Sequence, residues 1–352
     1  MLFRSAGHGI VGKDDVKIAG GTVTINAAKH GVQANDSVRL AEADVTVNAG
    51  EKDGIHVSDD ADAEEGTESD SFFYMADGSL VIKAGDDGIH ADADALIEGG
   101  SIDVTESYEG IEALAIKVSG GDIKVAATDD GFNAAGGSSQ SSSDSTFGDD
   151  DWQGGKGGGF SDGGTDGSIE ISGGNVYVQA GGDGLDSNGS LSVSGGYTVV
   201  CGPTQGDTSV LDFNSTGTIT GGTFIGTGGA GMAASFSDAE QGLIAVSVGN
   251  QSAGQTVTLK DADGNTLAEV TPELDYAGVY ISTADMTQGS TYSLTAGTYS
   301  ESITLSENIY STLTGGMQGG GLGGGGPRSG MNGEMPDGGP TGNMKGGPER
   351  SS

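Results

Sequence analysis

Hydrophobic and polar residues alternate in short runs that recur along most of the chain. Examples are residues 20–27 (GGTVTINA), 78–84 (GSLVIKA), 120–127 (GGDIKVAA) and 173–180 (GGNVYVQA). Strict alternation is typical of β-strands that bury one face. We therefore expect every second residue of these runs to point inward, namely Val23, Ile25, Leu80, Ile82, Ile123, Val125, Val176 and Val178.

A second pattern joins an acid or histidine, a glycine and an apolar residue, and it recurs seven times. Its glycines are Gly9, Gly31, Gly54, Gly88, Gly110, Gly131 and Gly184. The spacings between them are 22, 23, 34, 22, 21 and 53 residues, and the long spacings contain insertions. A further apolar run closes each copy, as in residues 95–97 and 116–118. A fixed period of this size predicts a stacked repeat architecture.

Short β runs separated by glycine or aspartate turns, without a helical pattern, predict an all-β fold. Each copy would form one coil of a parallel β-helix, with about 21–23 residues per coil. Leucine-rich repeats fit less well, because Val, Ile and Ala dominate the apolar positions. The calcium-binding nonapeptide repeat shares the Gly pairs and aspartates, but its period of about nine residues does not match.

The pattern divides the chain into three expected parts. Residues 1–241 form the β-helix, with an acidic insertion at about 59–72 and a Gly/Ser-rich insertion at 138–167. Residues 242–310 lose the Gly pairs and contain a predicted hairpin that turns at Asp263–Gly264, so we expect a small β module that caps the helix. Residues 311–352 are rich in Gly, Met and Pro and predict a disordered tail.

The composition restricts the partners. The 352 residues include 51 acidic and 14 basic side chains, which give a net charge of −37. Nucleic acid and anionic lipid would be repelled, and a polyanionic ligand would need metal ions between it and the protein. No apolar stretch is long enough to span a membrane, so we expect no membrane insertion. We also expect a monomeric protein. The single cysteine, Cys201, follows two valines and is expected to be buried.

The start of the chain predicts a truncated array. The segment MLFRSAGHGI is unlike a signal peptide, and the pattern predicts no leading strand before the first copy of the motif, at His8. A bare first coil would expose a sheet end. Our interpretation is that the chain is an N-terminally truncated fragment of a longer, exported precursor.

Stacked coils would align the acids of the repeated motif in one column. The predicted metal ligands are Asp53, Asp86, Asp87, Asp92, Glu109, Glu112, Asp129, Asp130, Asp183 and Asp186, and His56, His90 and Asn133 occupy the downstream position in other coils. Carboxylates about 5 Å apart repel by about 3 kcal/mol per pair at an effective dielectric of 20. Clustered carboxylate oxygens with loose geometry are suited to Ca²⁺.

Two other interpretations of this column stay open. Aspartate before glycine is also a common turn former, which explains the glycines and part of the aspartates but not the doubled acids or Glu109. Zinc is less favoured than calcium, because His56 and His90 lie 34 residues apart among carboxylates. Outside the column, Trp152 in the Gly/Ser-rich insertion could stack on a sugar ring or lie in a disordered surface loop.

The segments GGTVTINAAKHGVQAND, KDGIHV, FFYMADGSLVIKAGDDGIHADA and TDDGFNAAGG resemble a bacterial carbohydrate-binding β-helix family known from clostridial cell-surface proteins. The resemblance covers roughly residues 7–300. It implies a right-handed parallel β-helix related to family 9 pectate lyases, with calcium held by aspartates of adjacent coils. By motif, the ligands would be Asp86 and Asp87 with Asp53, and Asp129 and Asp130 with Glu109. Where the lyase pattern has a further aspartate, this chain has His90 and Asn133.

Three functions follow from these patterns. The first is a non-catalytic, calcium-dependent binder of acidic plant polysaccharide (pectin of the polygalacturonate type) or cellulose, secreted to the cell surface as the resemblance implies. The second is a polysaccharide lyase, in which Lys124 would remove the proton beside a uronate carboxylate. A role as a solubilising surface residue is favoured over this one for Lys124. The third is a surface spacer or adhesin that calcium stiffens. We expect the first, and so no enzyme activity.

Overall fold

The computed structural model describes residues 1–58, 70–135, 167–204, 208–231 and 234–313. These residues form strands, turns and loops, and they contain no helix. This part of the chain accordingly has no helix that could cross a membrane. The expected all-β class is therefore confirmed for the described part of the chain.

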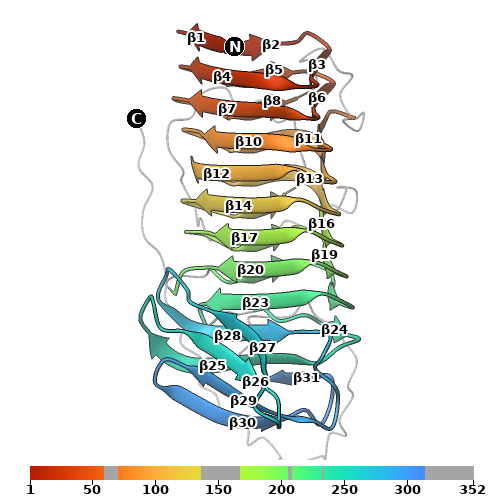
Figure 1. Cartoon of the computed structure of the whole chain (residues 1–352), viewed down its shortest axis with the longest axis vertical. Coiled ribbons are helices and arrows are strands. Elements are labelled where there is room, and N and C mark those ends of the chain that lie inside the picture. Colours follow the sequence, from red (N-terminus) through yellow and green to blue (C-terminus); the bar gives the residue numbers. More distant parts are fainter. Residues whose placement is uncertain (59–69, 136–166, 205–207, 232–233, 314–352) are drawn as a thin grey trace, which may run out of the picture. The chain divides into compact units, whose positions relative to one another are not determined.

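The first long sheet contains one strand from each successive coil (Figure 1). Its parallel strands are β1 (Leu2–Ser5), β4 (Gly21–Ala27), β7 (Ala43–Ala49), β10 (Gly78–Lys83), β12 (Ser101–Ser107), β14 (Asp122–Ala127), β17 (Asn175–Gln179), β20 (Tyr197–Cys201) and β23 (Thr223–Gly228). Alternate residues of these strands face the interior, because successive side chains of a strand point to opposite faces.

The second long sheet has two columns of parallel strands. The first column contains β2 (Ile10–Val11), β5 (Val32–Ala34), β8 (Ile55–Val57), β15 (Phe132–Ala134), β18 (Leu185–Ser187) and β21 (Leu211–Phe213). The second contains β3 (Asp15–Ile18), β6 (Ser37–Leu40), β9 (Phe72–Met75), β16 (Ser168–Ile171), β19 (Ser190–Val193), β22 (Gly217–Ile219) and β24 (Asp238–Ala239). The longer strands β11 (Ile89–Ile97) and β13 (Ile111–Val118) pair with both columns. The chain thus passes from one sheet to the other and back in each coil, as in a β-helix.

The core lies between the sheets and consists of stacked apolar residues. Seven of the eight residues expected to point inward are buried, and Val23 is partly buried against the same core. Pairing between β1 and β4 begins at Leu2 with Thr24, so Val23 lies at the open end of the stack. The alternation in the sequence therefore predicted the inward face correctly.

Two expectations about the ends of the stack need correction. The first coil does have a leading strand, because β1 pairs with β4 through Leu2–Ser5. This strand is only four residues long and precedes the first motif without a Gly pair, which is why the pattern did not indicate it. At the other end, Ser311 belongs to β31 (Ile309–Ser311), so the last strand reaches one residue into the expected tail. Away from the ends, the last residue of the expected acidic insertion at about 59–72 also differs, because Phe72 begins β9.

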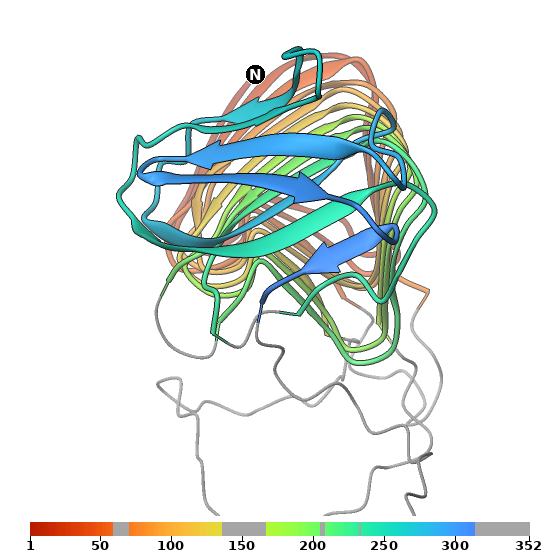
Figure 2. The ribbon, with the colours of Figure 1, turned by 90° about the horizontal axis from the view of Figure 1, so that it is seen from below.

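The strands after β24 continue the first sheet and add a smaller one. β28 (Tyr276–Ser282) pairs antiparallel with β23 and with β25 (Leu243–Gln251), and β31 pairs with β25. A four-stranded antiparallel sheet contains β26 (Val257–Lys260), β27 (Thr266–Val270), β29 (Thr291–Ala296) and β30 (Tyr299–Thr304). The predicted hairpin joins β26 to β27. Figure 2 shows these strands across the end of the coils.

Candidate metal centre

The acids of the repeated motif lie at the turn that leads from the first sheet into the second. Each motif glycine donates its backbone N–H to the carbonyl of the acid position in the next coil. The distances are 3.0 Å from Gly31 to Asp53, 2.9 Å from Gly54 to Asp87, and 2.9 Å from Gly88 to Glu109. The same bond continues to Asp130 and Asp183. The column of acids expected from the period is therefore present in the structure.

The aspartates of this column also stabilise the stack. Oδ1 of Asp53 accepts the backbone N–H of Asp87 at 3.3 Å, and Oδ1 of Asp87 accepts that of Glu109 at 3.3 Å. Oδ1 of Asp130 accepts the N–H of Asp183 at 2.6 Å. One oxygen of each carboxylate thus accepts a backbone hydrogen bond from the next coil. This supports part of the interpretation of these aspartates as turn formers. The other oxygen remains for a further contact.

The structure brings together the first set of ligands suggested by the resemblance. Carboxylate oxygens of Asp53, Asp86 and Asp87 lie within 4.8 Å of one another. Asp53 and Asp87 are buried, and Asp86 is partly exposed and 3.3 Å from the Lys52 ammonium. This group contains oxygen donors only.

The second suggested set is arranged differently. Oε1 of Glu109 accepts the side-chain N–H of Asn133 at 2.9 Å, and Asp129 forms a hydrogen bond with the Tyr108 hydroxyl. Within the described residues, Glu109, Asp129 and Asp130 are not among the groups of three whose ligand atoms lie within 4.8 Å. Oε2 of Glu109 and Oδ1 of Asn133 are nevertheless buried without a hydrogen-bond partner. Buried polar atoms normally have a hydrogen-bond partner, and these two hard oxygen atoms have none.

Burial shifts the pKa values of the column upward. It raises the pKa of Asp87 to about 7, and repulsion from Asp53 and Glu112 adds to the effect. Burial, together with the charges of Glu112 and Asp87, raises the pKa of Glu109 to about 9. A nearby cation would reverse these shifts, because it favours the ionised carboxylate.

The later coils repeat this pattern with aspartates. Burial raises the pKa of Asp183 and of Asp186 to about 7 and that of Asp130 to about 6. Asp212 pairs in register with Asp186 and adds to the repulsion, but the repeat pattern missed it. The copy of the motif that contains Asp212 has Val210 in place of the glycine. Alignment of residues 209–213 (SVLDF) with residues 183–187 (DGLDS) would have indicated Asp212.

The four histidines of the chain form a second, unexpected column. Ring centroids are 5.1 Å apart for His8 and His30, 4.1 Å for His30 and His56, and 5.1 Å for His56 and His90. The column joins histidines from two different positions of the repeated motif. His30 directly precedes the motif glycine Gly31, whereas His56 follows the motif glycine Gly54. The prediction from the sequence paired only His56 with His90, so the place of His30 beside them was not predicted.

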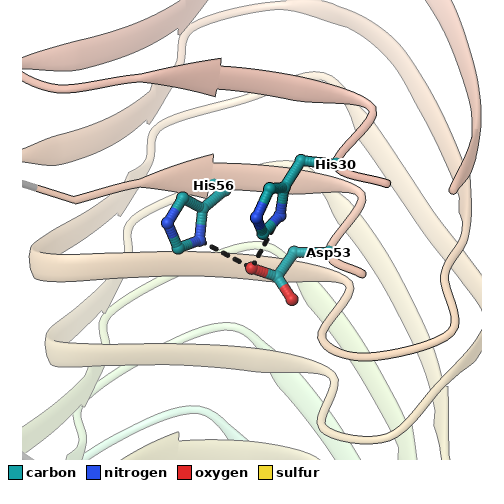
Figure 3. Close-up of side chains that lie close together, drawn as sticks. All are labelled: His30, Asp53 and His56. Atoms are coloured by element: carbon teal, nitrogen blue, oxygen red, sulfur yellow. Dashed lines mark hydrogen bonds and ion pairs between the residues drawn. The ribbon is translucent and has the colours of Figure 1, made fainter. Parts of the chain in front are cut away.

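Asp53 lies between two of these histidines (Figure 3). Its Oδ2 is 2.6 Å from Nδ1 of His56 and 3.2 Å from Nδ1 of His30. Burial by itself would raise the pKa of Asp53, but the hydrogen bonds with both imidazoles outweigh it and hold the pKa below its usual value. These donor atoms lie within 4.8 Å of one another.

His90 is surrounded by carboxylates. Its Nδ1 is 2.5 Å from Oε2 of Glu112 and 3.5 Å from Oδ2 of Asp87, and its Nε2 is 3.1 Å from Oδ1 of Asp92. Burial would lower its pKa, but the bonds with these three carboxylates outweigh it and raise the pKa. These carboxylates thus favour the protonated form of His90, at the position where the lyase pattern has an aspartate.

Two other predicted residues lie elsewhere. Lys124 is on β14, in the first sheet, with its ammonium 6.0 Å from the centre of the Tyr177 ring. It lines a shallow groove with Asn175, Tyr177 and Tyr197, and none of the predicted metal ligands lines that groove. Trp152 lies outside the described residues.

Comparison with known proteins gives one match. A family model described as carbohydrate-binding domain-containing protein matches residues 4–148. Searches of curated proteins and of solved structures found no match. The matched segment contains the acid column from Asp53 to Asp130 and all four histidines. The first coils of the chain are therefore similar to carbohydrate-binding domains, and this similarity supports carbohydrate binding.

Proposed function

We propose that this protein is a non-catalytic, calcium-dependent binder of an acidic polysaccharide of the polygalacturonate type. The observation that carries the proposal is the oxygen-only group of Asp53, Asp86 and Asp87, within the segment that matches carbohydrate-binding domains. We further propose a right-handed coil and a monomeric protein that is extracellular or at the cell surface. Cellulose is the alternative ligand.

The donor chemistry of this group fits Ca²⁺. Calcium takes six to eight oxygen ligands at about 2.3–2.6 Å in flexible geometry. Asp53, Asp86 and Asp87 would hold the ion and leave positions for other oxygens, such as those of a uronate carboxylate. Bound calcium would supply the positive charge that a chain of net charge −37 needs beside a polyanion. Asp86 is the most exposed of the three and would face the polysaccharide.

Affinity electrophoresis through a polygalacturonate gel tests the proposal, with calcium and with a chelator. We expect retardation only with calcium. Asp86→Asn should weaken it about tenfold or more, since it removes a ligand charge and leaves the backbone bonds of Asp53 and Asp87 intact. Asp44→Asn, on the exposed side of β7, makes the same charge change and should not alter retardation.

Each other outcome of the gel experiment favours a different function. Equal mobility with calcium and with chelator would refute polygalacturonate binding and favour a calcium-stiffened spacer or a binder of cellulose. Calcium-dependent retardation with formation of unsaturated sugar, abolished by Lys124→Ala, would establish the lyase instead. Loss of retardation in Asp44→Asn to the same degree as in Asp86→Asn would show that net charge, and not this site, controls binding.

A further inference from the structure

A cluster of mixed nitrogen and oxygen donors shares Asp53 with the oxygen-only group, and its two histidines have no part in the proposed function. Nδ1 of His30 and Nδ1 of His56 both point at Oδ2 of Asp53 (Figure 3). The three side chains come from two neighbouring coils. Gly31, next to His30, donates its backbone N–H to the carbonyl of Asp53, and His56 lies on β8, which follows Asp53 in the chain. Two imidazoles and one carboxylate converge on one point.

The donor set distinguishes this cluster from a calcium site. Imidazole nitrogen is a good ligand for zinc and its neighbours in the transition series, whereas Ca²⁺ prefers oxygen. A tetrahedral ion with bonds of about 2.0–2.1 Å places adjacent ligand atoms about 3.3 Å apart. The present separations are 3.2 Å for His30 and 2.6 Å for His56. The two nitrogen–oxygen distances therefore need to lengthen by less than about 1 Å to admit an ion.

The surroundings of the cluster orient its ligands. Oδ1 of Asp53 is held by the backbone N–H of Asp87 at 3.3 Å, which leaves Oδ2 for the cluster. The His30 ring is stacked between His8 and His56, so its plane is fixed on both faces. Contacts of this kind, outside the ligands themselves, commonly determine ligand orientation in metal sites.

The cluster is also accessible to an ion. The Asp53 side chain is 6% exposed and that of His30 is 12% exposed, but the His56 side chain is 21% exposed. His56 would thus be the entrance ligand. The acidic residues nearby would raise the local concentration of cations.

We propose that His30, Asp53 and His56 form a binding site for a divalent transition-metal ion of the zinc class. The three side chains supply two nitrogen ligands and one oxygen ligand, and a further coordination position stays open to water or to an oxygen of a ligand. The site shares Asp53 with the oxygen-only group but does not depend on calcium or polysaccharide binding.

Calorimetric titration of the full, metal-free chain with ZnCl₂ tests the proposal, in buffer that contains excess CaCl₂ and no polysaccharide. We expect one zinc ion to bind despite the calcium. His30→Gln and His56→Gln should each weaken this binding at least about tenfold. Asp44→Asn, which removes a charge on the exposed side of β7 outside the cluster, should change the affinity less than about twofold. Equal affinities in all four proteins would overturn the proposal.

A spectroscopic measurement on the unaltered chain keeps the test decisive if a variant fails to fold. X-ray absorption at the zinc edge should show nitrogen and oxygen ligands at about 2.0–2.1 Å with the scattering pattern of two imidazoles. A shell of oxygen ligands without imidazole would place the ion elsewhere and overturn the proposal. Failure of polygalacturonate binding would leave both zinc experiments unaffected, so the two proposals fail separately.

Discussion

At the scale of single residues, the acid column combines a structural and a chemical role. Aspartate is short enough for Oδ1 to reach the backbone N–H of the next coil, as Asp53 and Asp87 do. Glu109 is longer and instead accepts a bond from Asn133, with Oε2 buried and unpartnered. The buried and unsatisfied carboxyl at this position therefore costs stability when it is ionised.

This cost predicts a pH dependence in the metal-free protein. Because the pKa of Glu109 is raised to about 9 from its usual 4.5, the folded state favours the protonated form. The free energy of unfolding should therefore decrease as the pH rises from about 4.5 to about 9. Glu109→Gln, which keeps a neutral side chain at every pH, should decrease this slope and stabilise the protein at pH 8 by about 1–3 kcal/mol.

Thermal unfolding in chelator across this pH range provides the measurement. Glu170→Gln, an exposed change on β16, serves as the matched control and should leave the slope as it is in the unaltered protein. Part of the slope should persist in Glu109→Gln, because Asp87, Asp183 and Asp186 also have raised pKa values. An identical slope in both variants would contradict the assignment to Glu109.

At the scale of elements, the outer face of the first sheet changes character along the stack. One row of outward positions, in register from β4 to β23, contains Thr24, Thr46, Val81, Asp103, Lys124, Tyr177, Val199 and Ile225. The last two are buried in a second core with Leu259 and Leu294 of the four-stranded sheet. The row becomes apolar where this smaller sheet covers the coils.

This covering predicts different costs for one substitution at two points of the row. Val199→Asp places a charge in the buried contact and should destabilise the protein by several kcal/mol, because Val199 lies in a cluster of buried hydrophobic residues. Thr46→Asp makes a similar change at a partly exposed position of β7 and should cost less than about 1 kcal/mol. Denaturant unfolding measures both values, and equal destabilisation would mean that the smaller sheet does not seal this face.

At the scale of the whole stack, the motif glycines determine how closely the coils approach. A Cβ added at Gly88 would lie 2.5 Å from the carbonyl oxygen of Gly110 and 2.7 Å from a methyl group of Val104. The motif glycines do not have positive φ, so close approach and not turn geometry requires them. The glycine column thus permits the hydrogen-bonded spacing of the coils at the turns that carry the acids.

Gly88→Ala should therefore destabilise the protein by about 1–3 kcal/mol or more, because the extra methyl group meets backbone atoms of the next coil. Gly7→Ala is the matched control, since an added Cβ there has only the Ser5 hydroxyl within 4 Å. Thermal unfolding compares the two variants. Destabilisation of Gly88→Ala no greater than that of Gly7→Ala would mean that the stack adjusts without cost.

The sequence by itself determined the all-β class, the inward face and the column of acids. These features repeat from coil to coil, so the alternation from Ile25 to Val178 and the spacing of the glycines express them locally. Parallel strands in register place identical motif positions above one another, which is why Asp53, Asp87 and Glu109 align. The hairpin at Asp263–Gly264 was predictable for the same reason, because turn chemistry is local.

Only the tertiary structure decided which unlike positions meet. His30 reaches His56 because side chains at different motif offsets lean across neighbouring coils, and no period in the sequence expresses such a contact. The strand β1 and the antiparallel pairing of β28 with β23 depend on single, non-repeated segments. Burial of Val199 and the raised pKa of Glu109 likewise depend on which groups from distant parts of the chain exclude water there. Long-range contacts of this kind exist only in the folded molecule.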